Sequence, residues 1–421
     1  MKKSKFKTID RCRVCGNKNL VEIINLGEQY LSGVFPDVKS NDNISKGPLI
    51  LVKCHSEDEA INFCGLLQLK HSYDLDEMYG DNYGYRSGLN PSMVKHLNQK
   101  VQSICDLVEL NTDDLIIDIG SNDGTTLNAY PEGFNLVGID PTASKFKKYY
   151  NESIKVITEF FTDTLITDFY PNKKAKVVTS FSMFYDLEDP IKFAKQISNI
   201  LDINDGIWVF EQSYMPLMLE RTSFDTICHE HLEFYGFIQI LWVLDNANLK
   251  AINVDFNDIN GGSFSVVAAH KNTKRKSNSK LIRSVINDEL NSGLTQLQPY
   301  YNFSKRVKNS CAELKEYVQK AIKEGKKIYG LGASTKGNVL LQYCGFSYNE
   351  ISAIGEVNVD KFGKYTPGTL IPIVKESEIF DKHPDILLVL PWHFHEFFLR
   401  SHFFKGKTLL FPLPELRVVI A

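Results

Sequence analysis

Two segments of this chain share one plan, in which an apolar strand leads through a glycine-rich turn into a helix. The first is LIIDIGSNDGTTL at 115–127, and the second is KIYGLGASTKGNVLLQY at 327–343. This plan opens a doubly wound α/β sheet, whose ligands bind where the strands end. Strands and helices alternate after each segment, so we expect two parallel sheets. The 421 residues suffice for both, because a single core stops growing at roughly 250–300 residues.

The first glycine turn is a candidate cofactor loop made of Gly120, Ser121, Asn122, Asp123 and Gly124. Its glycines let a ligand approach the backbone, and amides near the helix start favour an anionic group. A dinucleotide fingerprint would read G-x-G-x-x-G, and Asp123 would repel a pyrophosphate but suits a sulfonium and an amino group. Asp140 ends the next strand, where such folds place an acid on ribose hydroxyls. The loop and Asp140 together favour S-adenosylmethionine (SAM) over NAD.

Two further strand ends supply candidate ligand contacts. Ser182, Met183 and Phe184 follow the strand predicted at 176–181 and are candidate SAM contacts. Glu211 lies near the end of the strand predicted at 206–213 and is a candidate substrate contact. The alternatives are core packing for Met183 and Phe184, and a structural carboxylate with satisfied hydrogen bonds for Glu211.

The stretch FDTICHEHLEFYG, just beyond that strand, places His229, Glu230 and His231 among apolar neighbours. If it is extended, residues 229 and 231 face one side and residue 230 the other. The spacing differs from H-E-x-x-H, so we do not expect metal here. An imidazole among apolar groups keeps a pKa near the working pH, and a carboxylate can fix its tautomer. We therefore predict an acid–base centre, with a hydrogen-bonded interdomain histidine pair as the alternative.

Four cysteines near the N-terminus have the pattern of a structural zinc site. Cys12 and Cys15 form a C-x-x-C followed by glycine, and Cys64 repeats the Cys-Gly pattern. Cys54 completes the predicted set, and His55 is the alternative third ligand. Without a surrounding βαβ pattern, a redox C-x-x-C or inert surface cysteines fit less well.

Two more segments are candidate substrate contacts. DEMYGDNYGYRSGLN at 76–90 is rich in tyrosine and irregular, as binding loops often are, and packing between domains explains it equally well. In the second glycine loop, Ser334 and Lys336 could hold a phosphate together with the backbone amides. This loop lacks the G-K-[ST] ending of a Walker motif, which disfavours ATP hydrolysis.

Composition argues against several classes of partner. The formal net charge is −3, so no general attraction to nucleic acid or an anionic membrane follows. A solvated loop explains the basic run at 271–280. The sequence has neither an apolar run of membrane-spanning length nor a signal-peptide pattern. We therefore expect a cytoplasmic protein that binds neither nucleic acid nor membrane.

Taken in order, these motifs resemble the zinc-containing, SAM-dependent sugar C-methyltransferases of deoxysugar pathways, such as those making tetronitrose. The resemblance covers nearly the whole chain, through CRVCG, CGLLQL, YGYRSG, IDIGSNDGT, VGIDP, EQSY, HEHLEFY, NGGSF, GASTKGN, KYTPGTLIPI and FPLP. It implies an α/β protein with a small zinc-binding domain at 1–75 and a central Rossmann-like class I SAM methyltransferase domain at 76–250. A C-terminal Rossmann-like domain at 251–421 would help to bind a nucleotide-linked sugar.

The resemblance also implies a mechanism. The family's sugar is typically a dTDP-4-keto-6-deoxyhexose, methylated at C3 after loss of a proton next to the ketone. His231 matches the family's base, Glu230 would orient nearby groups, and Tyr83 or Tyr85 would offer a hydroxyl to the enolate oxygen. The implied substrate contacts are Arg86, Glu211, Asn260, Ser263, Ser334 and Lys336.

Two positions near the predicted chemistry depart from the family pattern. Cys228 stands where the family has a tyrosine before H-E-H, and Asn260 stands where it has the histidine of H-G-G-S. O- or N-methylation of a nucleotide-linked sugar therefore stays an alternative to C-methylation. A noncatalytic sugar-nucleotide-binding protein is the alternative from another class.

Overall fold

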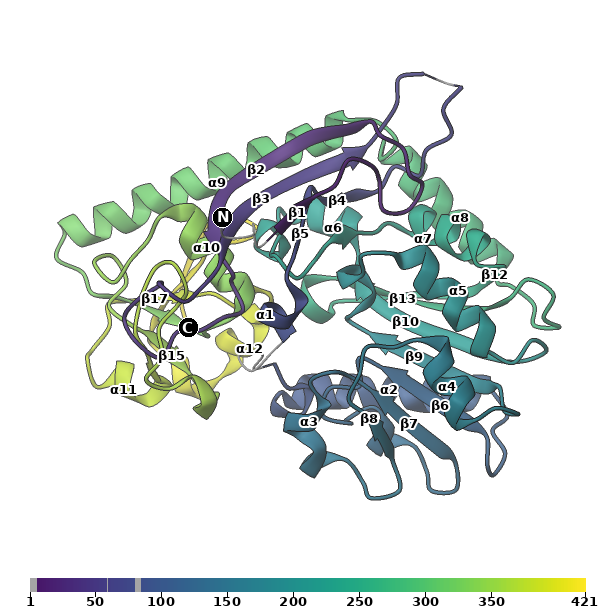
Figure 1. The fold of residues 1–421 in the computed structure, drawn as a ribbon. Coiled ribbons are helices and arrows are strands. Elements are labelled where there is room, and N and C mark those ends of the chain that lie inside the picture. Colours follow the sequence, from purple (N-terminus) through teal and green to yellow (C-terminus); the bar gives the residue numbers. More distant parts are fainter. Residues whose placement is uncertain (1–5, 59, 80–84) are drawn as a thin grey trace.

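The structure is a computed structural model that describes residues 6–58, 60–79 and 85–421. Four sheets organise these ranges. In Figure 1 the N-terminal strands run along the top of the molecule, the large central sheet lies to the right, and the C-terminal sheet lies to the left. The two α/β sheets therefore stand side by side, and the N-terminal strands lie above both. This confirms the predicted fold class.

The central sheet has the strand order β12-β13-β10-β9-β6-β7-β8. Its strands are β6 (Leu115–Ile119), β7 (Asn135–Ile139), β8 (Lys155–Ile157), β9 (Ala175–Phe181), β10 (Ile207–Ser213), β12 (Leu249–Asn257) and β13 (Ser263–His270). Strands β6 to β10 are parallel, and β13 pairs antiparallel with both β10 and β12. The order reverses between β6 and β9, the topological switch point where open α/β sheets bind ligands. The sheet also continues to His270, past the predicted boundary at residue 251.

Helices cover both faces of the central sheet because its strands are apolar on both sides. Ile116 packs in one core with residues of α2 (Pro91–Leu107), and Ile117 packs in another with residues of α5 (Pro190–Ile200) and α7 (Phe237–Asn246). Successive strand residues face opposite sides, so each face carries its own apolar row. The start of α5 is fixed by Asp189, whose carboxylate accepts from the backbone N–H of Lys192.

The N-terminal part is antiparallel. Its strands are β1 (Phe6–Thr8) paired with β5 (His71–Tyr73), and a sheet in the order β11-β4-β3-β2 with β2 (Leu20–Tyr30), β3 (Lys46–Cys54), β4 (Leu67–Leu69) and β11 (Glu233–Phe234). Strand β11 directly follows the H-E-H stretch. It pairs Glu233 with Gln68 and Phe234 with Leu67. The H-E-H stretch is therefore anchored to the N-terminal sheet at its end.

The C-terminal sheet has the order β16-β15-β14-β17-β18-β19. Its strands are β14 (Ile328–Leu331), β15 (Ile354–Glu356), β16 (Ile373–Lys375), β17 (Ile386–Val389), β18 (Thr408–Phe411) and β19 (Arg417–Ile420), all parallel except β19. Helix α10 (Thr335–Cys344) follows the glycine loop, and the hydroxyl of Ser334 caps its start by accepting from the N–H of Gly337. This confirms the second parallel sheet.

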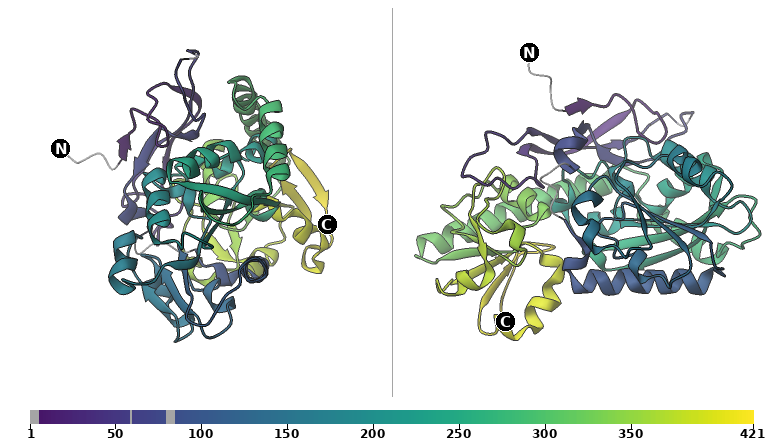
Figure 2. Two further views of the ribbon diagram at one scale, coloured as in Figure 1. Left: turned by 90° about the vertical axis from the view of Figure 1, so that its right-hand side faces the viewer. Right: turned by 60° about the horizontal axis from the view of Figure 1, so that its bottom comes forward.

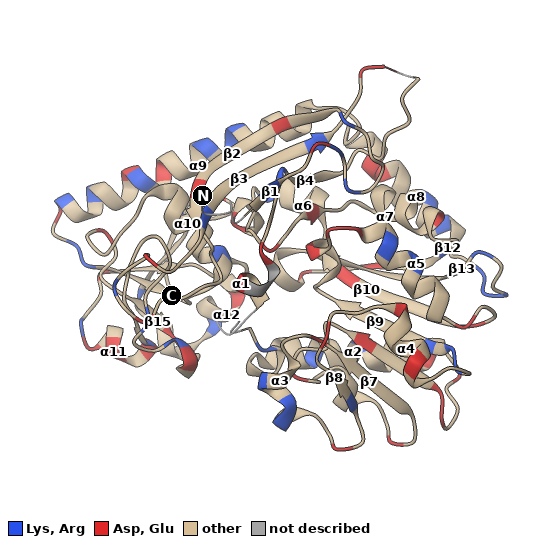
Figure 3. Ribbon diagram, viewed as in Figure 1, with Lys and Arg blue, Asp and Glu red and all other residues tan. Residues whose placement is uncertain are grey.

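The remaining helices surround and connect these sheets. They are α1 (Leu75–Tyr79), α3 (Ala143–Phe146), α4 (Asp163–Phe169), α6 (Met215–Glu220), α8 (Ser279–Asn291), α9 (Gln298–Lys323), α11 (Glu376–Phe380) and α12 (His395–Arg400). The long helix α9 passes along the N-terminal strands toward the C-terminal sheet (Figure 2). Helix α9 carries both basic and acidic side chains (Figure 3), and along its sequence the basic residues Lys305, Arg306 and Lys308 precede the first acidic one. Among the described ranges, every helix is too short or too polar to cross a bilayer.

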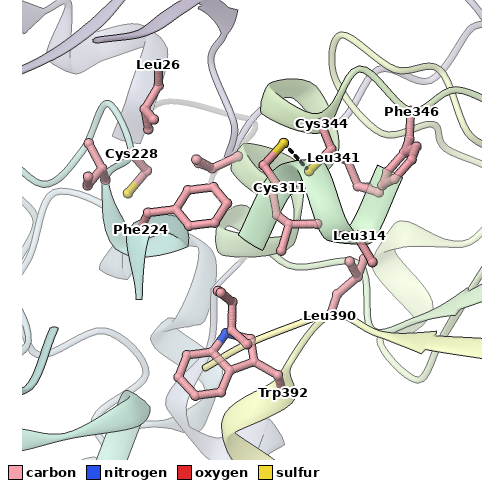
Figure 4. Close-up of a cluster of buried hydrophobic side chains, with 14 of the residues drawn as sticks. Leu26, Phe224, Cys228, Cys311, Leu314, Leu341, Cys344, Phe346, Leu390 and Trp392 are labelled. Carbon is pink, nitrogen blue, oxygen red and sulfur yellow. Dashed lines mark hydrogen bonds between the residues drawn. The ribbon is translucent and has the colours of Figure 1, made fainter. Parts of the chain in front are cut away.

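One apolar core joins three regions that are distant in the sequence (Figure 4). Leu26 comes from β2, Phe224 and Cys228 precede the H-E-H stretch, and Cys311 and Trp392 come from the C-terminal part. Phe224 and Cys228 are each about 1% exposed. Burying such a side chain stabilises by roughly 1.5–3 kcal/mol, so this core holds the parts against one another.

Candidate functional site

The four predicted zinc ligands form one cluster. The Sγ atoms of Cys12, Cys15, Cys54 and Cys64 all lie within 4.8 Å of one another, and the Cys12–Cys64 and Cys15–Cys54 distances are both 3.5 Å. A tetrahedral zinc with Zn–S bonds of about 2.3 Å places its sulfurs about 3.8 Å apart, so the cluster fits this ion. Four thiolates leave no coordination position for a substrate. The zinc is therefore structural.

Neighbouring groups suit the negative charge of a tetrathiolate site. The amide of Asn17 donates to Cys54 Sγ at 3.4 Å. The buried ammonium of Lys53 donates to the carbonyl of Gly65, next to Cys64, at 2.8 Å. The ring of His55 packs edge-on against Phe63 at 5.5 Å and lies outside the cluster of ligands. Cys54 is thus the third thiol of the set, as predicted.

The predicted SAM loop lies at the switch point of the central sheet. Gly120 and Gly124 adopt φ angles of +75° and +77°. A Cβ at Gly124 would meet the ring of Tyr150 at 2.7 Å, so only glycine fits there. The backbone N–H of Asn122 donates to Asp140 Oδ2 at 2.9 Å, and the hydroxyl of Ser121 lies 2.8 Å from that of Tyr150. Asp140 therefore holds the loop in shape at the end of β7.

The polar side chains of this loop bind the segment that follows α1. Asn122 accepts from the N–H of Ser87 at 2.9 Å, and Asp123 accepts from the N–H of Gly88 at 2.9 Å. The Arg86 side chain lies 3.6 Å from Asp123 and stacks on the ring of Tyr149 at 4.2 Å. Asp123 is thus engaged by the chain itself. Tyr85 is about half exposed, and Tyr83 lies outside the described residues.

The residues after β9 differ in their surroundings. Ser182 has a φ of +55°, and the side chain of Met183 packs against Gly120, so Met183 borders the glycine loop. Phe184 is fully buried, with its ring 5.5 Å from that of Trp208 and 5.4 Å from that of Phe210. Phe184 thus occupies the aromatic core, the alternative considered from the sequence.

Glu211 is surrounded by polar partners. Its Oε1 lies 2.6 Å from His96 Nε2, and its Oε2 accepts from Lys100 Nζ at 2.9 Å and from the amide of Asn257 at 2.8 Å. Burial opposes ionisation, but the hydrogen bond from His96 and the charge of Lys100 outweigh it, so the pKa of Glu211 is lowered. The two partners from α2 could not have been paired with Glu211 from the sequence, because more than a hundred residues separate them.

The H-E-H stretch is a turn, neither strand nor helix. The N–H of His231 donates to the carbonyl of Cys228 at 3.1 Å, which turns the chain between them. His229 is fully buried, with its ring 4.6 Å from that of Tyr73, and burial lowers its pKa to about 4. His231 is only partly buried and stacks edge-on against Tyr185 at 4.5 Å. The two imidazoles therefore lie in different surroundings.

His231 has the tautomer of a general base. Its Nδ1 lies 2.8 Å from the carbonyl oxygen of Thr226, which requires the hydrogen to sit on Nδ1. Its Nε2 then carries the lone pair and makes no hydrogen bond within the described ranges. Burial, and secondarily the charge of Lys336, lower the pKa of His231 to about 3. The imidazole is therefore neutral with a free lone pair on Nε2, but its pKa lies below the working range predicted from the sequence, because burial and the charge of Lys336 disfavour the imidazolium.

Lys336 reaches this site from the C-terminal glycine loop. Its ammonium donates to the carbonyl of Asn260 at 2.9 Å. Burial lowers the pKa of Lys336, and the charge of Asp225 opposes the shift. Asp225 in turn accepts from the indole of Trp392 at 2.8 Å. Residues of both α/β parts thus meet beside His231.

The other predicted substrate contacts have structural partners. Ser334 caps α10, and the hydroxyl of Ser263 donates to the carbonyl of Ile259 at 2.9 Å. Asn260 adopts a φ of +55°, and its carbonyl receives Lys336. The Gly261 carbonyl next to it accepts from Arg221 at 2.8 Å.

Two carboxyl groups complete the site. Glu230 lies against Gly33 and near Thr335, so it also sits between the N- and C-terminal parts. Asp186, which sequence reasoning missed, accepts from the hydroxyl of Tyr79 at 2.8 Å. Asp186 follows the end of β9, the same signal that pointed to Ser182–Phe184, and could have been found by extending that segment. Burial raises the pKa of both acids.

Family models match three consecutive parts of the chain. They are a putative zinc binding domain at residues 12–79, a methyltransferase domain at 93–254 and a C-methyltransferase C-terminal domain at 258–414. The chain is also 27% identical to C-methyltransferase NovU from Streptomyces niveus, over 99% of this chain and 98% of that protein. The chain is therefore similar to C-methyltransferases along nearly its whole length. This enzyme is therefore a SAM-dependent methyltransferase with a structural zinc site.

Solved methyltransferases resemble part of this chain. Magnesium protoporphyrin IX methyltransferase from Synechocystis, with bound S-adenosylhomocysteine (SAH), is 14% identical, covers 46% of this chain and 91% of its own, and gives a TM-score of 0.34. The putative methyltransferase in complex with the Trm112 activator of Haloferax volcanii is 14% identical to this chain. The match covers 43% of this chain and 95% of that one, with a TM-score of 0.33.

Proposed function

We propose that the enzyme methylates a carbon next to the carbonyl of a nucleotide-linked 4-keto deoxysugar, with His231 as the base. One observation carries the proposal: His231 donates through Nδ1 to the carbonyl of Thr226, which leaves the lone pair on Nε2, and Nε2 has no hydrogen bond among the described residues. A C-methyltransferase must remove a proton from carbon, whereas O- and N-methylation need no such acidic carbon. The match to C-methyltransferase NovU over nearly the whole chain supports carbon as the acceptor.

The proposed reaction begins with proton removal. His231 Nε2 takes the proton, and the electron pair of the C–H bond forms a carbon–carbon double bond as charge moves to the ketone oxygen. SAM, when bound, supplies an electrophilic methyl group on a sulfonium. The carbon then forms a bond to this methyl as the sulfur–methyl bond breaks, which regenerates the ketone. The two enclosing α/β parts align the reactants, and alignment alone can contribute several kcal/mol.

Most of the other predicted residues keep their proposed roles. We assign SAM to the edge formed by the loop at 120–124, Asp140 and residues 182–183, whereas Phe184 fills the aromatic core. We assign the sugar nucleotide to the junction near Arg86 and Lys336, where cations can meet phosphate oxygens. The division into zinc-binding, SAM-binding and sugar-nucleotide-binding parts is proposed with one change, since β12 and β13 belong to the central sheet.

The test uses dTDP-4-keto-6-deoxyglucose as a probe substrate. With SAM, NMR should show a new methyl group on carbon. With SAH in deuterium oxide, mass spectrometry should show exchange of a proton next to the ketone, and His231→Gln should abolish it. Two results with the wild-type enzyme would contradict the carbanion route. One is transfer of the methyl group to oxygen or nitrogen, and the other is methylation by an enzyme that does not exchange the proton next to the ketone in the presence of SAH. His402→Gln, an exposed histidine on the C-terminal part, is the matched control.

A further inference from the structure

Asp186 lies beside the proposed base. It ends the 3₁₀ helix η4 (Phe184–Asp186), directly after Tyr185, whose ring packs against His231 at 4.5 Å. The carbonyl of Tyr185 accepts from the N–H of Leu232 at 2.8 Å, so the two segments are bonded to each other. The carboxyl of Asp186 therefore has a fixed position next to the turn that carries His231.

The two oxygens of this carboxyl are not equivalent. Oδ2 accepts from the hydroxyl of Tyr79 at 2.8 Å. Oδ1 is buried and has no hydrogen-bond partner among the described residues. An unpaired buried oxygen costs free energy comparable to a lost hydrogen bond. Asp186 as a whole is only partly buried, so the residue lies at the border of the protein interior while its Oδ1 atom is covered.

The surroundings of Asp186 favour its neutral, protonated form. Burial raises its pKa well above the ordinary value, the bond from Tyr79 opposes this, and the nearby carboxyl of Glu230 raises the pKa further. Because Oδ2 already accepts a hydrogen bond, the proton belongs on Oδ1. A neutral carboxylic acid in such a setting can donate a strong hydrogen bond to an oxygen that becomes negative.

We infer that Asp186 is a further catalytic residue, which donates a hydrogen bond from Oδ1 to the ketone oxygen of the substrate while His231 removes the neighbouring proton. The inference rests on the proposed function and assigns to Asp186 the role predicted for Tyr83 or Tyr85. The proton stays on Asp186 throughout: the hydrogen bond shortens as the oxygen gains charge and lengthens when the ketone is restored. Glu230, through its nearby charge, helps keep Asp186 protonated.

The test compares three variants in SAH-dependent proton exchange of dTDP-4-keto-6-deoxyglucose in deuterium oxide. Asp186→Leu keeps the branched shape of the side chain, although it is larger, and has no donor; it should lower the exchange rate about 10²–10³-fold, the usual cost of one oxyanion donor. Asp186→Asn keeps a donor and should retain most of the rate. Glu188→Ala, an exposed acid two residues away, should exchange at the wild-type rate. If Asp186→Leu does not fold, Asp186→Ala takes its place.

Three results would overturn the inference. Wild-type-like exchange in Asp186→Leu would show that the carboxyl does not contact the reacting oxygen. An equal loss in Asp186→Asn would show that a carboxylate charge is needed, contrary to a neutral donor. Absence of exchange in the wild-type enzyme would remove the proposed function together with the inference, so the two failures are distinguishable. SAM affinity, measured by calorimetry, should be the same in all folded variants.

Discussion

Replacing Glu211 by glutamine should destabilise the enzyme by about 2–4 kcal/mol at pH 7. In the wild type the carboxylate binds His96, Lys100 and Asn257 at 2.6–2.9 Å and so ties β10 to α2 and β12. A glutamine can accept hydrogen bonds only at its one oxygen. Its NH₂ group, itself a donor, would face the donors of Lys100 and Asn257. Breaking a buried ion pair costs about 3–5 kcal/mol, and we lower this range by about 1 kcal/mol because the Lys100 side chain is 16% exposed.

The effect of Glu211→Gln should depend on pH. The pKa of Glu211 is lowered in the folded state. The contribution of its carboxylate to the free energy of unfolding is therefore complete above the unfolded pKa of about 4.3, and it is lost as the pH falls through the folded pKa. Urea unfolding followed by Trp fluorescence should therefore show a wild-type advantage at pH 7 that shrinks in acid. The exposed Glu220→Gln is the control and should change stability by less than about 0.5 kcal/mol. A Glu211→Gln enzyme as stable as the wild type would refute a structural role and favour the predicted substrate contact.

Three further predictions follow from the same structure. Cys54→Ser should lose zinc, measured by atomic emission, and should melt at a lower temperature, because structural zinc contributes on the order of 10 kcal/mol of binding free energy. Full retention of zinc by this variant would contradict the set of four ligands. Lys336→Met should raise the pKa of His231 by removing a nearby positive charge, so the acidic limb of the pH–rate profile should move to higher pH. If that limb does not move, the charge of Lys336 does not act on His231. Gly124→Ala should weaken SAM binding in calorimetry at least about tenfold, since its Cβ would meet Tyr150 at 2.7 Å, whereas Gly133→Ala has free space and should bind normally.

Local patterns were sufficient for the zinc ligands and for both α/β sheets. Cysteine spacing fixes which thiols can share one ion, and Cys54 and Cys64 lie with Cys12 as predicted. Apolar runs and glycine turns specify strands and their loops, because these depend on neighbours within a few residues. The parallel sheets followed from the alternation of strands and helices.

Long-range contacts decided the details of the site. His229 and His231 look alike in the sequence, but the turn buries His229 against Tyr73 and leaves Nε2 of His231 without a hydrogen bond from the described residues. Likewise, nothing near Glu211 indicates that His96 and Lys100 would neutralise it. Phe184 follows a strand end, as ligand contacts do, yet it fills the aromatic core.

The amino-acid sequence by itself determined the four thiols of the zinc cluster, the two strand–glycine loop–helix units and the H-E-H stretch that contains the candidate base. These features rest on covalent spacing and local conformation, which the order of residues fixes. Only the tertiary structure decided that Lys336 would act on His231 and that Asp186 would keep an oxygen without a partner among the described residues. Charges interact, and buried polar atoms find or lack partners, through distances in space that the sequence does not state.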